Sequence, residues 1–427
     1  MLRQRWLHVI PAAFIMYTIA FIDRTNISLA LPSISHDLHM NPVQAGEAAG
    51  VFYWGFLLLQ VPGGHLARHW SAKRFISILL ILWGVCAVAG GLVRNWQEFW
   101  TLRLLLGVAE GGVWPAVLVL LSDWFPRAER GRANALWMLC LPTAVVVSSP
   151  VSGWILGRWD WRVLLVSEGI LPFVWLIAWW QLIDDHPNQA RWISNEERDY
   201  LIGTLRTENQ ELQPTRQESY LKSIARPAVL VMIVIYFLQT TGGFGFLYWL
   251  PSAIEREKHL SHFVVGILFA IPFVAAGIFM VLNSYHSDRR HERRAHVAGP
   301  LALGGVLLGA SVFTADRWPL LSFIFVCFAA VGPNAPLGPF WAIPTETLPP
   351  AVSGSAMGVI NAFGSLGGFC GPLLVGYLEK RTGNFHYAFG ALSLAFLIAA
   401  LLAVSFLPRR RMAASEAGAA LPDSVSS

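Results

Sequence analysis

Long apolar segments separated by short polar turns dominate the chain. Each segment is close to the length of about 20 residues that a helix needs to cross a membrane. The segments are continuously apolar rather than alternating, which predicts helices and excludes a transmembrane β-barrel. The pattern therefore predicts an all-α membrane protein with twelve transmembrane helices in two six-helix halves. The segments begin near residues 7, 44, 75, 97, 133, 163, 228, 263, 295, 318, 352 and 385.

A polar stretch between the sixth and seventh segments divides the chain. Within it, Ser194 and Glu197 have the spacing of a capping box, which predicts a short surface helix. We therefore expect a linker with one surface helix, and a disordered cytoplasmic tail after the last segment. The expected parts are an N-terminal half (1–183), a cytoplasmic linker (184–226), a C-terminal half (227–408) and the tail (409–427).

Composition agrees with a membrane location. Hydrophobic residues make up 55% of the 427 and charged residues 13%, and the mean hydropathy is +0.51. The net charge of +5 is spread over short turns, with no basic domain that would indicate nucleic-acid binding. Turns on the side of the N-terminus carry roughly twice as many Lys and Arg as the opposite turns, so the positive-inside rule places both termini in the cytoplasm. We expect a multi-pass protein of the cell inner membrane.

The two halves share motifs at equivalent turns. Asp123-Trp-Phe-Pro126 follows the fourth segment, and Glu346-Thr-Leu-Pro349 follows the tenth, 223 residues later. Lys73-Arg74 of the first half corresponds to Arg293-Arg294 of the second half. A repeat displaced by six helices keeps its direction in the membrane, which is typical of transporters that bind substrate near the midplane between two rocking halves.

Charged residues lie within the first and fourth segments, where hydrocarbon would surround them. Asp23 and Arg24 are adjacent in the first, and Arg103 and Glu110 share one helix face in the fourth. Each such group costs roughly 2.5–3.5 kcal/mol at a helix centre, so these residues indicate a transport route. The alternative is an ion-pair cluster that only fastens the two helices together.

The four charges predict separate roles. Arg24 and Arg103 are candidate substrate-binding residues because a guanidinium can bond both oxygens of a carboxylate and keeps its proton. All 12 histidines lie in turns or near segment ends, which leaves Asp23 and Glu110 as candidate proton carriers. Burial raises the pKa of a carboxyl group and a nearby arginine lowers it, so an arginine that moves toward substrate would switch the acid.

Other classes of function find no support in the sequence. The apolar segments contain no nucleotide-binding or catalytic constellation, which argues against an enzyme. The four cysteines lack metal-ligand spacing, and we expect neither a metal nor another cofactor.

Several motifs resemble those of one transporter family. The chain resembles the Major Facilitator Superfamily, and within it the anion:cation symporters of organic acids, which include the tartrate, phthalate and hydroxyphenylacetate permeases. The resemblance implies proton-coupled import of a small organic anion by a protein that we expect to be monomeric. The motifs that carry it are Asp23-Arg-Thr-Asn26, Arg103-Leu-Leu-Leu-Gly107-Val-Ala-Glu110, Trp124-Phe-Pro-Arg-Ala-Glu-Arg130-Gly131 and Asn361-Ala-Phe-Gly364-Ser-Leu-Gly367-Gly368.

The turn between the second and third segments departs from the family pattern. The resemblance implies an acid that latches the cytoplasmic side, but Arg68 stands in its place and Ser71 replaces a glycine. The equivalent turn of the second half keeps Asp288-Arg289, which we predict to act in gating.

Neutral residues complete the predicted substrate site. Asn361 matches a position that the resemblance implies in substrate binding, and Gln239 and Tyr53 are further candidates within apolar segments. A membrane sensor that binds an organic acid without moving it stays open as an alternative, as does an exporter or exchanger of the same superfamily.

Overall fold

A computed structural model describes residues 4–211, 226–258, 260–348 and 350–408 of the chain. All regular structure within these ranges is helical, and eleven of the helical segments are long and apolar enough to cross a membrane. The prediction of an all-α membrane protein is confirmed. The predicted tail and residues 212–225 of the predicted linker lie outside the described residues.

The first half begins with one long helix, and most of its later spans are pairs of helices in line. Glycine or proline residues accompany several of the breaks, for example Gly112 and Pro172. The helices are α1 (Gln4–Asp37), α2 (Pro42–Gly50), α3 (Phe52–His69), α4 (Ala72–Gly90), α5 (Trp96–Gly111), α6 (Val113–Trp124), α7 (Arg127–Met138), α8 (Cys140–Arg158), α9 (Trp161–Gly169) and α10 (Leu171–Leu182).

Helices α2 and α3 together form the remaining span. Val51 separates them but keeps a helical backbone, with φ −57° and ψ −25°, so the chain continues as one bent segment. This span is less apolar than the others because α3 carries Gln60, His65 and Arg68. With the eleven apolar spans it completes the twelve that the sequence predicts.

The second half repeats this plan after a surface helix, α11 (Asn195–Glu211). Helix α11 is anchored to the start of α1, where Arg5 Nη1 lies 2.5 Å from Glu197 Oε1. The remaining helices are α13 (Pro227–Lys258), α14 (His262–Arg290), α15 (Arg294–Thr314), α16 (Pro319–Ala329), α17 (Val331–Asn334), α18 (Leu337–Thr347), α19 (Pro350–Ser365), α20 (Gly367–Thr382) and α21 (His386–Phe406).

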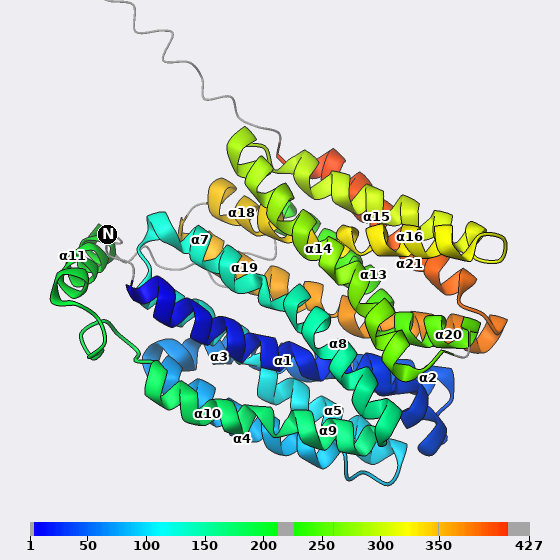
Figure 1. Cartoon of the computed structure of the whole chain (residues 1–427). Helices are drawn as coiled ribbons and strands as arrows, with labels where there is room; N and C mark the ends of the chain where they lie inside the picture. The colour runs from blue at the N-terminus through cyan, green and yellow to red at the C-terminus, as the bar shows by residue number, and fades with distance from the viewer. Residues whose placement is uncertain (1–3, 212–225, 259, 349, 409–427) are drawn as a thin grey trace, which may run out of the picture.

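The two halves lie side by side along their lengths (Figure 1). Helices α3, α4, α5, α9 and α10 belong to one bundle, and α13, α14, α15, α16 and α21 to the other. Helix α8 of the first half runs next to α14 of the second, and α2 lies next to α20. We call the end that carries α11 and the start of α1 the linker end, and the end that carries α2 the far end.

At the far end the two halves meet backbone to backbone. A Cβ atom added to Gly46 of α2 would lie 2.4 Å from the Pro372 carbonyl oxygen of α20. One added to Gly376 of α20 would lie 2.1 Å from the carbonyl oxygen of Pro42. Only glycine permits this approach, so the absence of side chains determines how closely the halves pack here.

Candidate functional site

Close packing between α3 and α5 positions the charges of the fourth span. A Cβ at Gly107 would lie 2.0 Å from the carbonyl oxygen of Phe52, and one at Gly111 would lie 2.3 Å from that of Phe56. The glycines therefore bring α5 against α3. Arg103 and Glu110 lie on the same side of α5 and are buried there.

Arg24 and Glu110 form an ion pair between α1 and α5. Arg24 donates from Nη2 to Glu110 Oε2 at 2.9 Å and from Nε to the same oxygen at 3.2 Å. Both residues are buried, with exposed fractions of 4% and 1%. The rings of Phe52 and Phe56 lie 4.7 and 4.9 Å from the guanidinium carbon, so aromatic faces surround the cation.

Asp23 points away from this pair and toward α4. Its carboxylate accepts hydrogen bonds from the indole of Trp83 and, at 3.5 Å, from the amide of Asn26. It lines a small cavity inside the first half together with Arg103. Adjacent residues of α1 therefore face two different environments.

Among the residues that the structure describes, the hydrogen-bond partners of Arg103 are neutral groups. Its Nη2 donates to the hydroxyl of Tyr248 and to the carbonyl of Ala49, each at 3.3 Å. Its Nε and Nη1 are buried without a hydrogen-bond partner among the residues described. The Tyr248 contact links the first half to α13 of the second.

A larger cavity lies between the two halves and contains about 910 Å³ of space not filled by protein atoms. Arg24 lines it from the first half, together with Tyr53. Gln239 and Asn361 line it from the second half. The structure therefore brings four of the predicted substrate-binding residues to one cavity, whereas Arg103 lies at the smaller one.

Neutral hydrogen bonds hold the amides of this central cavity. Asn361 Nδ2 donates to Gln60 Oε1 at 2.8 Å, a buried contact between α19 and α3. Gln239 Nε2 donates to the carbonyl oxygen of Pro333 at 2.8 Å. Gln60 is not among the predicted site residues, although it is a polar side chain within an apolar segment, as Gln239 is.

A third buried acid, Glu168 of α9, lies in the first half. Its Oε1 accepts a hydrogen bond of 2.7 Å from the Ser152 hydroxyl of α8. Asn26 is close enough to interact with both Glu168 and Asp23. The buried polar region of the first half thus extends across α1, α8 and α9.

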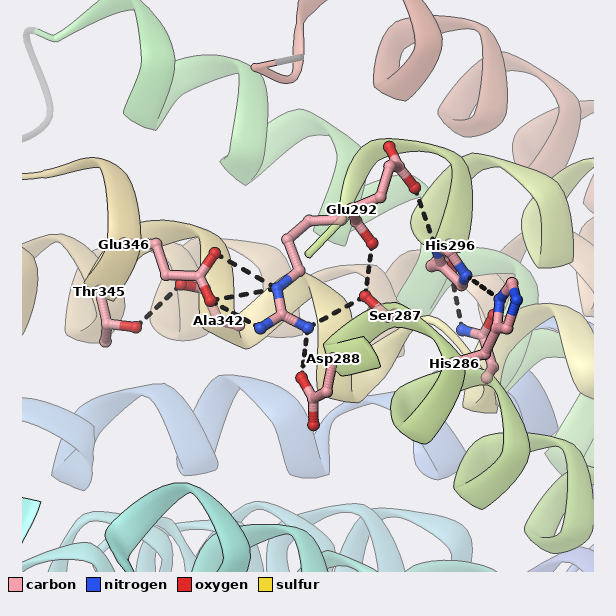
Figure 2. Close-up of polar contacts among 10 residues, drawn as sticks. His286, Ser287, Asp288, Glu292, His296, Ala342, Thr345 and Glu346 are labelled. Atoms are coloured by element: carbon pink, nitrogen blue, oxygen red, sulfur yellow. Dashed lines mark hydrogen bonds and ion pairs between the residues drawn. The ribbon is translucent and has the colours of Figure 1, made fainter. Parts of the chain in front are cut away.

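At the linker end of the second half, Arg293 joins two acids from different helices (Figure 2). Its Nη1 lies 2.5 Å from Asp288 Oδ1 at the end of α14, and its Nη2 lies 2.7 Å from Glu346 Oε1 of α18. Partial burial opposes the charged form, yet the two carboxylates raise the pKa of Arg293 above its usual value. Arg289 instead lies over the ring of Tyr285, with 4.5 Å from its guanidinium carbon to the ring centre.

A chain of ring contacts continues from the same turn. Figure 2 shows His296 between Glu292 and His286. His296 Nδ1 lies 2.7 Å from Glu292 Oε2, and His296 Nε2 lies 2.7 Å from His286 Nδ1. Glu292 is partly buried, which favours its neutral form. The backbone N–H of Ala295 and the His296 ring outweigh this effect and hold the pKa of Glu292 below its ordinary value.

The equivalent turn of the first half has different hydrogen bonds and ion pairs. Arg68 Nη2 contacts the Ser122 hydroxyl at 3.4 Å. Lys73 lies 3.6 Å from Asp184, beyond the end of α10, and the Ser71 hydroxyl donates to Asp185 at 2.6 Å. The loop after α10 therefore supplies the acids at this turn. The part of the chain that the structure describes contains no cluster suited to a metal ion.

Comparison with known proteins identifies the family. A twelve-helix fold with a buried ion pair at a cavity between two halves is the architecture of a secondary transporter. The family model of the Major Facilitator Superfamily matches residues 13–372 and 259–422. The chain belongs to this superfamily, which confirms the resemblance seen in its motifs; it is a multi-pass membrane transporter rather than an enzyme.

Relatives of known description align over nearly the whole chain. A protein from Agrobacterium vitis named "Putative tartrate transporter" is 31% identical, with 95% of this chain and 91% of the relative covered. The "Quinolone resistance transporter" of Acinetobacter baumannii is 28% identical, with 92% of each covered. The "Probable galactarate/D-glucarate transporter GudP" of Escherichia coli (strain K12) is 26% identical, with 92% and 91% covered.

Solved structures share the fold. The inward open conformation of the xylose transporter XylE from E. coli superposes with a TM-score of 0.77 at 16% identity, covering 95% of this chain and 97% of that one. A bacterial homologue of the human lysosomal transporter Spinster, in an inward-facing and occupied conformation, gives 0.74 at 18% identity, with 94% and 97% covered.

Proposed function

We propose that the protein is a proton-coupled symporter that imports a small organic anion by alternating access. One observation carries this proposal: Arg24, the cation at the wall of the central cavity, is held by an acid, Glu110. An acid that can be protonated would release its arginine to an incoming carboxylate. The relatives named "Putative tartrate transporter" and "Probable galactarate/D-glucarate transporter GudP" support an organic acid as the substrate class.

The transport cycle follows from this exchange of partners. With Glu110 protonated, Arg24 binds the substrate carboxylate and the loaded carrier turns inward. When the proton leaves, Glu110 recovers Arg24 and the anion is expelled. Each partner that Arg24 takes neutralises its charge, so a bare cation never stays buried.

Asp23 and Arg103 are the second coupled pair in this proposal. Both line the small cavity of the first half. Protonation of Asp23 would weaken its attraction for Arg103, which is joined to the second half through Tyr248. Two carboxylates can carry up to two protons, so a monovalent anion could enter with net positive charge and gain roughly 2.3 kcal/mol per charge per 100 mV.

The test separates coupling from binding. Glu110→Gln keeps the shape of the side chain but cannot lose a proton. In proteoliposomes we expect this variant to lose uptake driven by an imposed pH gradient while it retains exchange of labelled for unlabelled substrate. Loss of binding and exchange together with driven uptake would remove Glu110 from the role of proton carrier.

We propose that the linker end and both termini lie on the cytoplasmic side of the inner membrane, and that residues 184–226 tether two rocking halves. The excess of Lys and Arg in the turns on that side supports this orientation. Fusion of green fluorescent protein or alkaline phosphatase to the C-terminus tests it. The first fluoresces when it lies in the cytoplasm, and the second is active when it lies outside the cytoplasm. Phosphatase activity with a dark fluorescent fusion would reverse the orientation.

Export is the second candidate, favoured by the quinolone resistance transporter among the relatives. The same Arg24–Glu110 pair could exchange an outgoing anion for an incoming proton. The direction of substrate movement under an imposed pH gradient distinguishes the two. Accumulation on the alkaline side supports symport, and expulsion from it supports antiport.

A further inference from the structure

Aromatic side chains dominate the wall of the central cavity. Ten of the 22 residues that line it are Phe, Tyr or Trp, and both halves contribute them. Tyr17, Phe56 and Trp114 belong to the first half, and Phe273 and Trp341 to the second. A ligand held here would meet ring faces and edges over much of its surface, which suits an aromatic or apolar body.

The cavity offers one positive charge. Arg24 is the single Lys or Arg among its lining residues. Arg103 lies at the smaller cavity, where its Nη2 contacts Tyr248 and Ala49. A substrate with two carboxylates would leave one of them without a cationic partner in an apolar surrounding, which is costly.

Several amide and hydroxyl donors around the cavity are already engaged within the protein, although the Tyr53 hydroxyl has no hydrogen-bond partner in the described part of the chain. Asn361 donates to Gln60, and Asn334 Nδ2 donates to the Ala330 carbonyl at 2.9 Å. The Thr240 hydroxyl donates to the carbonyl of Gly364 at 2.6 Å. A ligand with many hydroxyl groups would have to break these bonds in order to form its own.

Some polar atoms of the cavity wall could form a hydrogen bond with one substituent on the ring of a ligand. Gln239 Oε1 and Trp341 Nε1 are buried and have no hydrogen-bond partner in the described part of the chain. One is an acceptor and the other a donor. A hydroxyl or similar group on the ring could use either of them.

From these observations we infer that the substrate is an aromatic monocarboxylate, whose carboxylate binds Arg24 and whose ring packs in the aromatic wall. This inference rests on the proposed function and narrows its substrate class. It sets the chain apart from the relatives named for tartrate, galactarate and glucarate, which are dicarboxylates rich in hydroxyl groups.

Binding to the purified full-length protein tests the class directly. Phenylacetate and 4-hydroxyphenylacetate are compared with tartrate and galactarate by calorimetry. Uptake of the same labelled acids is measured in proteoliposomes under an inward proton gradient, with protein-free vesicles subtracted for passive entry. We expect at least tenfold tighter binding of an aromatic acid than of either hydroxylated diacid, and driven uptake of that aromatic acid.

Each result has a defined meaning. Equal or tighter binding of tartrate or galactarate, with driven uptake, would overturn the inference but leave proton-coupled anion import intact. Failure to bind or take up any of the acids would overturn the proposed function and the inference together. Cyclohexylacetate matches phenylacetate in size without a π face, and equal binding of the two would overturn the requirement for an aromatic ring.

A substitution in the wall gives an independent readout. Trp341→Leu removes one aromatic face and leaves Arg24 in place, so we expect affinity for phenylacetate to fall at least fivefold and affinity for cyclohexylacetate to change less than twofold. Trp318→Leu, at an exposed position before α16, is the matched control and should change neither. Equal losses for both ligands in Trp341→Leu would show a general packing role and count against the inference.

Discussion

The two halves of the chain differ in where their charges lie. The first half buries charged residues in the middle of its helices, whereas the second half lines the central cavity with neutral groups such as Gln239 and Asn361. In the described part of the second half, Glu379 is buried but lies near the end of α20. Deep within the described spans of the first half, the buried charges are Asp23, Arg24, Arg103, Glu110 and Glu168, and Arg5 is buried at the start of α1.

At the linker end the two halves have different ion pairs at the equivalent turn, where Lys73 of the first half lies 3.6 Å from Asp184. The second half has an ion-pair cluster in which Arg293 joins Asp288 and Glu346. The first half has Arg68 where the repeat would place the equivalent of Asp288. The comparison teaches that the two repeats keep one helical plan but place their charges differently: the first half carries the acids of the proposed proton coupling, and the second half carries an exposed ion-pair cluster at its linker-end turn.

Arg24→Ala should have the largest effect. It removes the two charge-assisted hydrogen bonds that Arg24 would donate to the substrate carboxylate. Each is worth about 1.5–3 kcal/mol, so we expect uptake to fall at least about 100-fold. It also leaves Glu110 buried without its partner, which destabilises the fold by about 3–5 kcal/mol. The measurement is initial uptake in proteoliposomes, normalised to protein that elutes as a single peak in detergent.

The double variant Arg24→Ala/Glu110→Ala controls for misfolding because it removes the unpaired acid. It should regain thermal stability and still fail to transport. A similar loss of uptake from a neutral substitution in the second half, such as Gln239→Leu, would break the comparison between the halves.

Asp23→Asn ranks second. It cannot carry a proton, so we expect about a tenfold or greater loss of uptake driven by the pH gradient, with substrate exchange retained. Glu379→Gln is the matched control, since it removes a buried acid from the second half. Uptake as a function of external pH should flatten for the first variant and keep its wild-type shape for the second. Flattening in both would place proton coupling in both halves.

Asn361→Leu should have an intermediate effect. Loss of one neutral hydrogen bond to substrate, worth about 1 kcal/mol, predicts a rise in KM of about fivefold with little change in kcat. Gln60→Leu breaks the same contact between the halves without removing a residue that lines the cavity. If both variants changed kcat rather than KM, the contact between halves and not substrate binding would explain the role of Asn361.

Arg293→Ala should have the smallest effect of the four. Asp288 and Glu346 are exposed by 69% and 48%, so an ion pair there contributes about 1 kcal/mol or less. We expect a slightly lower Tm in detergent and a change in uptake rate of less than about fivefold. Arg290→Ala, which removes an exposed neighbouring arginine outside the predicted gating pair, should leave both unchanged.

Arg68→Asp tests the equivalent turn of the first half, where an arginine stands in place of the acid of the second half. It restores an acid where the family pattern has one, near Lys73 and Arg130 in the same region of the first half. If charge at this turn controls the linker end, Arg68→Asp should rescue part of the rate that Arg293→Ala loses. No change in the double variant would mean that the two turns act separately.

The helical spans were predictable because bilayer thickness imposes an apolar length on every helix. Even the least apolar span, α2–α3, was recognised from the length of its apolar run. The sequence predicted Asp288 and Arg289 as gating residues. In the structure the side chain that joins Asp288 to Glu346 is Arg293. Spacing alone does not show which of several arginines at a turn reaches across to another helix.

Contacts between distant segments were beyond the reach of the sequence. Gln60 and Asn361 are 301 residues apart and meet only because the two halves pack together. The neighbouring residues Asp23 and Arg24 looked like one pair, yet a helix turns about 100° per residue and so directs them to different cavities. Burial and cavity shape depend on packing that no local pattern encodes.

The contact between Gly46 and Pro372 has a consequence for the speed of the transport cycle. Because backbone atoms meet at Gly46 and Gly376, these two contacts can part and close again without a side chain between them changing rotamer. Bulky interlocking side chains would have to leave their packed positions one by one, which would raise the barrier between conformations. Contacts between glycine backbones at the far end can therefore close tightly against leakage and still open quickly.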